Sequence, residues 1–542
     1  MNPSPDPQTA KQPDKLSKKA AGVVGMAVAC SRVLGLVREQ VIASLFGAGN
    51  AVDVFVMAFR APNLLRDLFA EGALSTAFIT TFSKKIKTEG DASAWQLASK
   101  MATLTAVFMS LITLLGIVFA PQFIGILAGG FSPAKAALTV ELTRIMFPFI
   151  LLVSLAALAM GMLNAKNVFG MPAMASSFFN LGSIIGGVAF GWWLDPHFGE
   201  RSIVGLAIGT LIGGLMQLIV QFPALHRAGF RFRPDFAWRD DGVRQILRLM
   251  GPAVIAASAV QVNVMVNGSF ASYLGESAVS SLNYAFRLMQ LPLGIFGVAV
   301  GTVTLPVVAR FASVHDTAGV RTTLGHGIRL AFLLTIPCAV GLIFFAEPIL
   351  SLIYQHGKFS YADTLYAASA LKFYAVGLVA YSGIKVIAPA FYALDKRNLP
   401  MMVSFFSILT NYLLNLFITR YCGLGIRGLA LSTSFVAIIN FAILYRLMTR
   451  HVGGLETRAL FATLGKLALA CVPLALVCLA ARHWLFGGRA LEHMALLPKL
   501  SAVFGTIGFA AAAFGVTVAL LGIEEVEDVI RLIKRKLQRR PE

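Results

Sequence analysis

The chain has 542 residues, of which 57% are hydrophobic and only 13% are charged. Soluble domains carry about 25% charged residues, so this composition excludes an ordinary soluble protein and indicates that apolar surface faces lipid. The 46 Lys and Arg against 26 Asp and Glu give a net charge of +20. Because most of the basic residues lie between the apolar runs, this charge does not indicate nucleic-acid binding.

Fourteen apolar runs are long enough to cross a membrane as helices. A bilayer core about 30 Å thick needs roughly 20 apolar helical residues, and long runs without alternation exclude strands. The sequence therefore predicts an all-α polytopic membrane protein with 14 transmembrane helices. The runs span residues 20–45, 52–83, 98–128, 136–163, 172–194, 202–225, 246–272, 278–309, 325–346, 364–393, 400–419, 428–449, 460–483 and 496–522.

Polar segments flank these runs. Residues 1–19 are polar and Pro-rich, so we expect a disordered tail. Residues 524–542 are basic, which predicts either a helix on anionic lipid headgroups or a solvated tail. The loops on the side of the N-terminus hold most of the Lys and Arg, so both termini are predicted to be cytoplasmic.

Two internal matches relate helices that are six positions apart. Pro172 meets Pro400 at a shift of 228 residues, and Arg227 meets Arg450 at a shift of 223. The matches predict two parallel six-helix repeats, an architecture of transporters that work by alternating access. Chance similarity between apolar helices is the alternative. The predicted division is an N-terminal lobe 20–227, a cytoplasmic linker 228–245, a C-terminal lobe 246–450, and two extra helices within 451–523.

Charged residues lie deep in the first two predicted helices. A charge at the bilayer centre costs at least about 2.5–3.5 kcal/mol unless it faces water or a partner. In the first helix, a bend or local unwinding at Gly35 would bring Arg32 and Arg38 to one cavity wall, and in the second helix Pro62 separates Arg60 from Arg66. The arginines either line a cavity or form a self-neutralised structural network with Glu39, Asp53, Asp67 and Glu71.

The second half of the chain adds two basic residues within apolar runs. Arg287 and Lys385 lie in helices whose carboxylates are confined to the ends. A cavity that both halves line would therefore be positively charged. Since the planar guanidinium fork binds phosphate oxygens bidentately, the predominance of Arg favours an anionic diphosphate ligand over a cationic drug.

Several motifs resemble those of the MurJ (MviN) lipid II flippases of bacterial cell-wall synthesis. They are SRVLGLVRE (31–39), APNLLRD (61–67), FAEGALSTAF (69–78) and KVIAPAFYALDKRN (385–398), and the likeness covers essentially the whole chain. The resemblance implies the fold of the multidrug/oligosaccharidyl-lipid/polysaccharide (MOP) exporters, with two lobes that form a V-shaped, cationic central cavity. It also implies that lipid II is moved from the cytoplasmic to the periplasmic leaflet of the bacterial inner membrane.

The resemblance also implies roles for individual residues. Arg32, Arg38, Arg66 and Arg287 would contact the diphosphate and headgroup, and Lys385 is a weaker candidate. Asp53, Asn63 and Glu71 would act in gating or in keeping the cavity intact. We expect the same kind of role for four further residues, because of their charge or their effect on the backbone: Gly35, Glu39, Arg60 and Pro62. The last two helices would form a groove for the polyprenyl tail.

The sequence departs from the family pattern at three positions. Glu39 replaces the usual Asp, Asp67 occupies a position that is often basic, and Phe286 occupies one that is often Asp. These changes leave the ion-pair scheme open. Some relatives bind sodium through an acidic residue of the seventh helix, but no carboxylate lies between Asp241 and Glu276. We therefore predict no sodium site of this kind in the chain.

Motifs for catalysis or metal binding are missing from the sequence. The five Cys form no CxxC pair, no GxxxxGK[ST] loop occurs, and His326 and His356 are isolated. We expect no metal, no cofactor, no enzymatic activity, and a monomer. Three alternatives remain: a flippase for another polyprenyl-diphosphate glycan such as an O-antigen unit, a multidrug antiporter of the same fold, and a membrane scaffold without transport.

Overall fold

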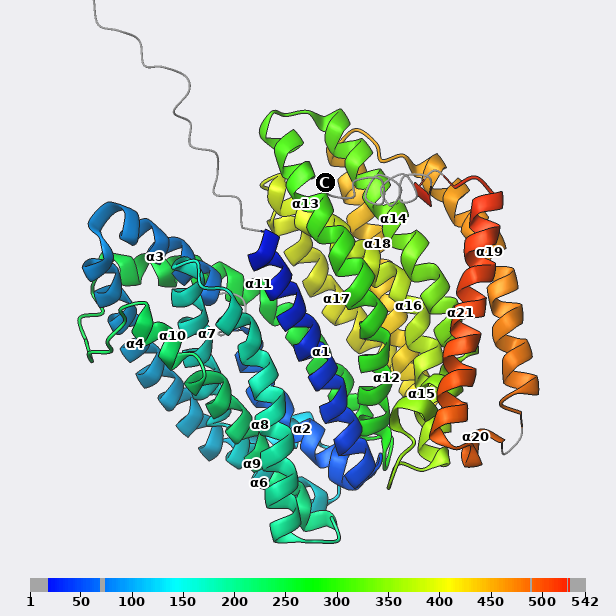
Figure 1. Ribbon diagram of the computed structural model, residues 1–542, viewed down its shortest axis with the longest axis horizontal. Coiled ribbons are helices and arrows are strands. Elements are labelled where there is room, and N and C mark those ends of the chain that lie inside the picture. The colour runs from blue at the N-terminus through cyan, green and yellow to red at the C-terminus, as the bar shows by residue number, and fades with distance from the viewer. Residues whose placement is uncertain (1–17, 69–73, 488–489, 524, 527–542) are drawn as a thin grey trace, which may run out of the picture. The chain divides into compact units, whose positions relative to one another are not determined.

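The computed structural model describes residues 18–68, 74–487, 490–523 and 525–526, and every regular element in these ranges is a helix (Figure 1). The tails predicted at 1–19 and 524–542 lie mostly outside the described residues, as does Glu71. The helices of the N-terminal part are α1 (Lys18–Phe46), α2 (Asn50–Leu65), α3 (Ser75–Glu89), α4 (Asp91–Val118), α5 (Ala120–Leu127), α6 (Pro133–Met146), α7 (Phe149–Ala165), α8 (Gly170–Leu194), η3 (Glu200–Ser202), α9 (Ile203–Ile219), α10 (Phe222–Arg227) and α11 (Asp241–Ser272).

The helices that follow are longer on average and are interrupted by two π-helical turns, η4 and η5. They are α12 (Ala278–Pro292), η4 (Leu293–Gly297), α13 (Val298–Ser313), α14 (Thr317–Phe344), α15 (Ala346–Tyr354), α16 (Tyr361–Ala393), α17 (Asn398–Phe417), η5 (Ile418–Cys422), α18 (Gly425–His451), α19 (Thr457–Trp484), α20 (Ala490–His493) and α21 (Leu496–Leu520).

Eleven helices or helix pairs of the described residues are long and apolar enough to span a membrane. They correspond to eleven of the predicted runs. The described residues of the runs 20–45, 52–83 and 246–272 are helical, but these runs are not among the eleven, so the number of 14 stays a prediction. Within the run 52–83, α2 and α3 have 16 and 15 residues, so each is short for a membrane span.

The chain forms two compact units by packing. Unit 1 combines the described residues up to Val41 with Ala58–Pro121 and Thr139–Ala257, and unit 2 combines Ile42–Met57 and Gln122–Leu138 with the residues from Ser258 onward. The boundaries fall inside α1, α2, α5, α6 and α11, so each of these helices contributes residues to both units. The lobes predicted from the internal repeats remain a prediction about sequence, separate from this packing.

In unit 1, α8 and α9 lie side by side with almost no space between their backbones (Figure 1). A Cβ atom at Gly209 would lie 2.4 Å from the amide nitrogen of Gly187, and one at Gly205 would lie 2.2 Å from that of Gly191. Small residues permit this approach, which stabilises helix pairs in lipid through van der Waals contact. The glycines of these two helices therefore determine how closely they pack.

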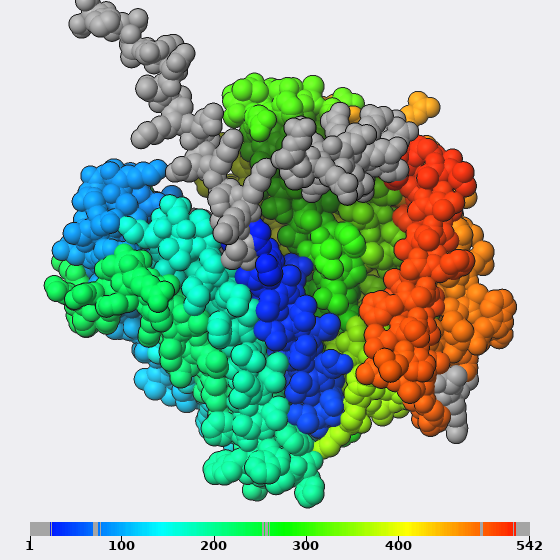
Figure 2. Space-filling view, viewed as in Figure 1, coloured from blue at the N-terminus to red at the C-terminus, as the bar shows by residue number. Residues whose placement is uncertain are grey.

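In unit 2, the core lies between α14, α16, α18 and α19. It contains large apolar side chains that are almost fully buried, including Phe332, Phe391 and Met448. In contrast to this buried core, α21 exposes large apolar side chains. Figure 2 shows α21 in red-orange along the surface of this unit. There Leu497 and Leu520 are about four-fifths exposed (79% and 82%), which is the pattern expected of a lipid-facing helix.

Candidate functional site

The first part of the candidate site lies on α1 and α8 in unit 1. Arg32 is exposed, whereas the Arg38 side chain is largely buried and its Nη2 lies 3.2 Å from Glu39 Oε1. The Arg38 guanidinium also lies over the Phe179 ring, 5.2 Å from its centroid. A neighbouring carboxylate and an aromatic face together stabilise a largely desolvated guanidinium.

The backbone of α1 stays helical through Gly35 and is not locally unwound there. The Asn180 side chain of α8 donates from Nδ2 to the Ser31 carbonyl at 3.1 Å, and a Cβ at Gly35 would lie 3.6 Å from the same nitrogen. The contact with α8 therefore fixes α1 at the level of its two arginines. It does not depend on a break in the helix.

The second part of the site lies at the end of α2. The helix continues past Pro62 to Leu65, and residues 66–68 form a π-helical turn. Arg66 donates from Nε (3.1 Å) and Nη2 (2.9 Å) to one Asp67 oxygen, while Asn63 donates to the other oxygen at 3.4 Å. Arg60 is half-buried on the same helix. Asp67 thus neutralises Arg66, and both side chains keep more than a fifth of their surface exposed (22% and 24%).

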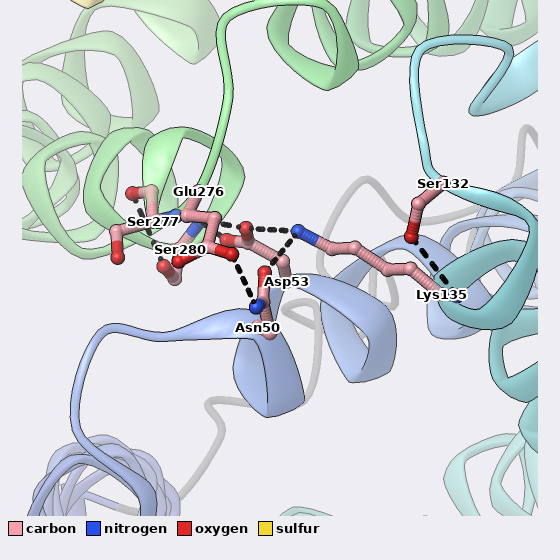
Figure 3. A network of polar contacts seen from close by, with 7 residues as sticks. All are labelled: Asn50, Asp53, Ser132, Lys135, Glu276, Ser277 and Ser280. Atoms are coloured by element: carbon pink, nitrogen blue, oxygen red, sulfur yellow. Dashed lines mark hydrogen bonds and ion pairs between the residues drawn. The ribbon is translucent and has the colours of Figure 1, made fainter.

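The third part is a polar cluster in unit 2 around Asp53, which is fully buried (Figure 3). Its carboxylate accepts hydrogen bonds from Lys135 Nζ at 2.8 Å, from the Ser280 amide at 2.7 Å and from the Ser277 amide at 3.0 Å. The two amides precede and begin α12, so the carboxylate caps that helix and interacts favourably with its dipole. Asp53 therefore joins α2, α6 and α12.

Asn50 extends the Asp53 cluster toward its exposed side. Its Oδ1 accepts a hydrogen bond from Lys135 Nζ at 2.8 Å, and its Nδ2 donates to Glu276 Oε1 at 2.9 Å. Ser277 has a positive φ of 63°, an uncommon conformation for a residue other than glycine. The hydrogen bonds of Ser277 with Asp53 and of Glu276 with Asn50 thus hold the turn before α12 in this left-handed conformation.

The remaining predicted site residues lie on two helices of unit 2 that pack together, α12 and α16. Arg287 of α12 is half-buried, and Lys385 of α16 is exposed. Where α13 crosses α16, a Cβ at Gly301 would lie 2.6 Å from the Lys385 carbonyl oxygen, so the backbone that carries this lysine is closely packed. The lysine side chain itself remains accessible.

The predicted residues thus fall into two groups. Arg32, Arg38, Arg60, Asn63 and Arg66 belong to unit 1, whereas Asp53, Arg287 and Lys385 belong to unit 2. Within each unit the structure brings together Arg38 with Glu39, Asn63 with Arg66 and Asp67, and Asp53 with Lys135. The convergence of both groups on one central cavity stays a prediction.

Sequence reasoning did not identify several partners of these residues. Lys135 lies between two predicted apolar runs, where a lysine is ordinary, and Ser277 and Ser280 have no distinctive sequence signal. Phe179 and Asn180 lie in an apolar run, where an aromatic residue is ordinary. A weak signal existed for Lys135, since a buried carboxylate such as Asp53 needs a cationic or hydrogen-bonding partner.

The seventh predicted helix, α11, contributes Asn267 to a cluster of amide side chains. Asn267 Oδ1 accepts hydrogen bonds from Asn411 and Asn415, each at 2.8 Å, and Asn267 Nδ2 donates to Thr433 Oγ1 at 3.1 Å. In the described part of the chain, no group of three or more His, Cys, Asp or Glu is placed to hold a metal ion. The amides thus join α11, α17 and α18 by neutral hydrogen bonds.

Comparisons with known proteins agree in sequence and in fold. The family model described as "Lipid II flippase MurJ" matches residues 42–492. "Lipid II flippase MurJ" of Burkholderia cenocepacia is 34% identical over 496 residues, covering 88% of this chain and 93% of its own. "Probable lipid II flippase MurJ" of Vibrio cholerae is 33% identical over 521 residues, covering 93% and 96%.

Solved structures show the same fold. The structure described as "Lipid II flippase MurJ, inward closed conformation" has a TM-score of 0.74 at 24% identity, covering 94% of this chain and 99% of its own. A "multidrug resistance MATE family transporter of the MOP superfamily" in an inward-facing conformation has a TM-score of 0.66 at 14% identity, covering 80% and 98%. The family model covers most of the chain, and close relatives align over nearly its full length. The chain therefore belongs to the MurJ lipid II flippase family.

Proposed function

We propose that this protein moves lipid II from the cytoplasmic to the periplasmic leaflet of the bacterial inner membrane by alternating access. The match of residues 42–492 to the MurJ family model carries this proposal. The helical fold that the chain shares with MOP transporters supports it, as do the arginines present in α1, in and just after α2, and in α12. The protein acts as a monomer with both termini in the cytoplasm, and its C-terminal tail contacts anionic headgroups.

In this proposal, Arg32, Arg38, Arg66 and Arg287 bind the diphosphate and headgroup of lipid II, and Lys385 assists. Arg38 and Arg66 each have a carboxylate as their immediate neighbour in the chain. Without substrate, Glu39 and Asp67 neutralise the two guanidinium groups. When phosphate oxygens arrive, each arginine exchanges carboxylate for phosphate, and the differential affinity of the two arrangements shifts the conformational equilibrium.

The cluster of Asn50, Asp53, Lys135, Glu276, Ser277 and Ser280 acts as the gate on the periplasmic side. Its hydrogen bonds hold the first part of α2 and of α6 against the start of α12. Both α2 and α6 continue from the cluster into residues of unit 1, namely from Ala58 and from Thr139. Breaking the bonds of Asp53 would free the ends of these helices, which is the kind of change that alternating access requires.

The test is leaflet-specific labelling of lipid II in cells depleted of the native protein. The cells are complemented with the wild type or with Arg32→Ala, Arg38→Ala, Arg66→Ala or Arg287→Ala. Hydrogen bonds to charged groups contribute about 1.5–3 kcal/mol each, so each variant is expected to lower translocation roughly tenfold or more. Arg310→Ala, at an exposed arginine in the last turn of α13, is the matched control and should translocate normally.

Membrane insertion of every variant is checked by its amount in the membrane fraction. Lipid II that stays in the inner leaflet despite normal insertion supports the proposal. If all four site variants translocate lipid II like the control, the assignment of these residues is wrong. If the wild type itself fails to translocate lipid II but moves another polyprenyl-diphosphate glycan, the substrate is wrong and the diphosphate chemistry remains.

A further inference from the structure

A second basic site lies in unit 2, away from the residues discussed so far. The helices α14 and α19 pack against each other, and both are candidate membrane spans. Beside their first turns is an open cavity of about 640 Å³, lined by Arg321, Leu455, Glu456, Thr457, Arg458, Ala459 and Ala462. Since both helices begin at this end, the cavity lies where the two spans enter the membrane.

Two arginines give the cavity its charge. Arg321 and Arg458 are both exposed, and neither forms an ion pair with any residue in the described ranges. The Arg321 guanidinium lies against the loop before α19, because a Cβ built at Gly454 would be 3.7 Å from its Cζ. Gly454 itself has a φ of 118°, which favours glycine and keeps this side of the guanidinium free of a side chain.

The one carboxylate in the lining is already engaged. Glu456 Oε2 lies 2.6 Å from Nη1 of Arg329, and this buried arginine also pairs through Nε with Glu525. Arg329 therefore forms ion pairs with both of these carboxylates. With Glu456 neutralised by Arg329, the charges of Arg321 and Arg458 make the opening of the cavity positive, as an anion site requires.

The start of α19 places the positive end of its helix dipole beside the cavity. Its N-cap residue, Glu456, forms no side-chain capping hydrogen bond, and the Thr457 amide donates to the Leu455 carbonyl. The floor is apolar, formed by Leu455, Ala459 and Ala462. The cavity thus combines a cationic rim with an apolar base.

An apolar stripe continues from the cavity along the outer face of α19. Phe461, Leu469 and Leu476 are 68%, 61% and 60% exposed. The path from Arg458 to Leu469 is eleven residues, or about 16 Å of helix, close to half of a bilayer core of about 30 Å. An acyl chain of one leaflet would fit this length.

We propose that the cavity binds the phosphate of an anionic glycerophospholipid, such as phosphatidylglycerol, whose acyl chains lie along α19. Arg321 and Arg458 bind the phosphate oxygens through their planar forks, as guanidinium groups do with phosphates generally. The lipid links α14 to α19 and steadies the segment around Glu525 that Arg329 holds. The phosphate site shares no residue with the arginines of the proposed diphosphate site. Since α19 is also one of the two helices predicted to form the groove for the polyprenyl tail, competition by undecaprenyl diphosphate tests which lipid binds there.

The experiment uses the purified full-length protein after delipidation. Phosphatidylglycerol and phosphatidylcholine are titrated separately, and bound lipid is counted by native mass spectrometry, with the melting temperature measured in parallel. The wild type should bind phosphatidylglycerol at least tenfold more tightly than phosphatidylcholine and melt at a higher temperature when it is bound. The double variant Arg321→Gln/Arg458→Gln should lose this preference, and Arg310→Gln, at the exposed arginine of α13, should keep it.

A variant that keeps both positive charges controls for loss of binding through misfolding. Arg321→Lys/Arg458→Lys should keep most of the preference, because the positive charges remain. Equal phosphatidylglycerol binding by the wild type and the double Gln variant would overturn the proposal. Two competition arms identify the source of the phosphate. If inorganic phosphate alone or an undecaprenyl diphosphate displaces phosphatidylglycerol at equal concentration, the occupant is that anion and the phospholipid assignment is wrong.

Discussion

At the residue scale, Asp53 is the most constrained charge of the candidate site. A carboxylate without exposed surface is stable only when hydrogen bonds and an opposite charge replace its hydration. Two backbone amides at the start of α12 and Lys135 provide these contacts. Since the amides belong to the backbone, Lys135 is the partner that mutation can remove.

We expect Lys135→Met to lower stability strongly in the wild type and only slightly when Asp53 is already Asn. Removing one partner of a buried ion pair costs about 3–5 kcal/mol because the other charge is left uncompensated. In the Asp53→Asn background there is no buried carboxylate for Lys135 to neutralise. Melting temperatures of the two single variants and the double variant in detergent give the coupling. Additive losses would contradict a direct Asp53–Lys135 interaction.

The same residues show what the sequence could reveal at this scale. Arg38 and Asp53 were recognisable because a charge within an apolar run is costly and needs a reason. Lys135 gave no comparable signal, because a lysine between two apolar runs is ordinary. Its role depends on a contact with a residue 82 positions away, which no local pattern encodes.

At the element scale, the contact between α8 and α9 depends on glycines that leave no room for a methyl group. We expect Gly209→Ala to destabilise unit 1 by about 1–3 kcal/mol, the usual range for overpacking in a closely packed interior. The new Cβ would lie 2.4 Å from backbone, which cannot move aside like a flexible side chain. The measurement is the melting temperature and the fraction of monodisperse protein after extraction.

Gly505→Ala is the matched control for Gly209→Ala. Gly505 lies within α21, and a Cβ there would meet nothing within 4 Å. Since Ala favours a helix over Gly by about 1 kcal/mol in water, this change should be neutral or slightly stabilising. If both substitutions had the same effect, the close backbone contact at Gly209 would not be what limits the packing of α8 against α9.

The elements themselves were largely predictable, because the length of an apolar run follows from the thickness of the bilayer. Eleven predicted runs correspond to candidate spans of the described residues. In the run 52–83, which is predicted as one helix, the described residues include two α-helices, α2 and α3. Polar groups of Asn63, Arg66 and Asp67 bond to one another at the end of α2, and hydropathy alone does not register this local arrangement.

At the scale of the whole molecule, the division into packing units was beyond the reach of sequence patterns. Hydropathy and internal similarity predict where helices begin and how repeats align, but the unit boundaries fall inside helices such as α2 and α6. Those boundaries are determined by long-range contacts, among them the bonds of Asp53 with α12.

In the proposed cycle, these bonds must break and form again with each lipid II molecule.

Cross-linking the Asp53 cluster across its exposed side is expected to stop transport. Asn50 and Glu276 contact each other at 2.9 Å, and the glutamate side chain is exposed, so Asn50→Cys/Glu276→Cys places two thiols within reach of a short bis-methanethiosulfonate reagent. The exposed Cys30 and Cys422 and the partly exposed Cys338 are first replaced by Ser, which leaves the new pair and the buried Cys471 and Cys478. Lipid II translocation should be lost on cross-linking and return on reduction, whereas each single-cysteine variant should be unaffected by the reagent. Because the link holds α2 to the turn before α12, translocation at the full rate by cross-linked protein would mean that the cluster stays closed throughout the cycle and is a structural support, not a gate.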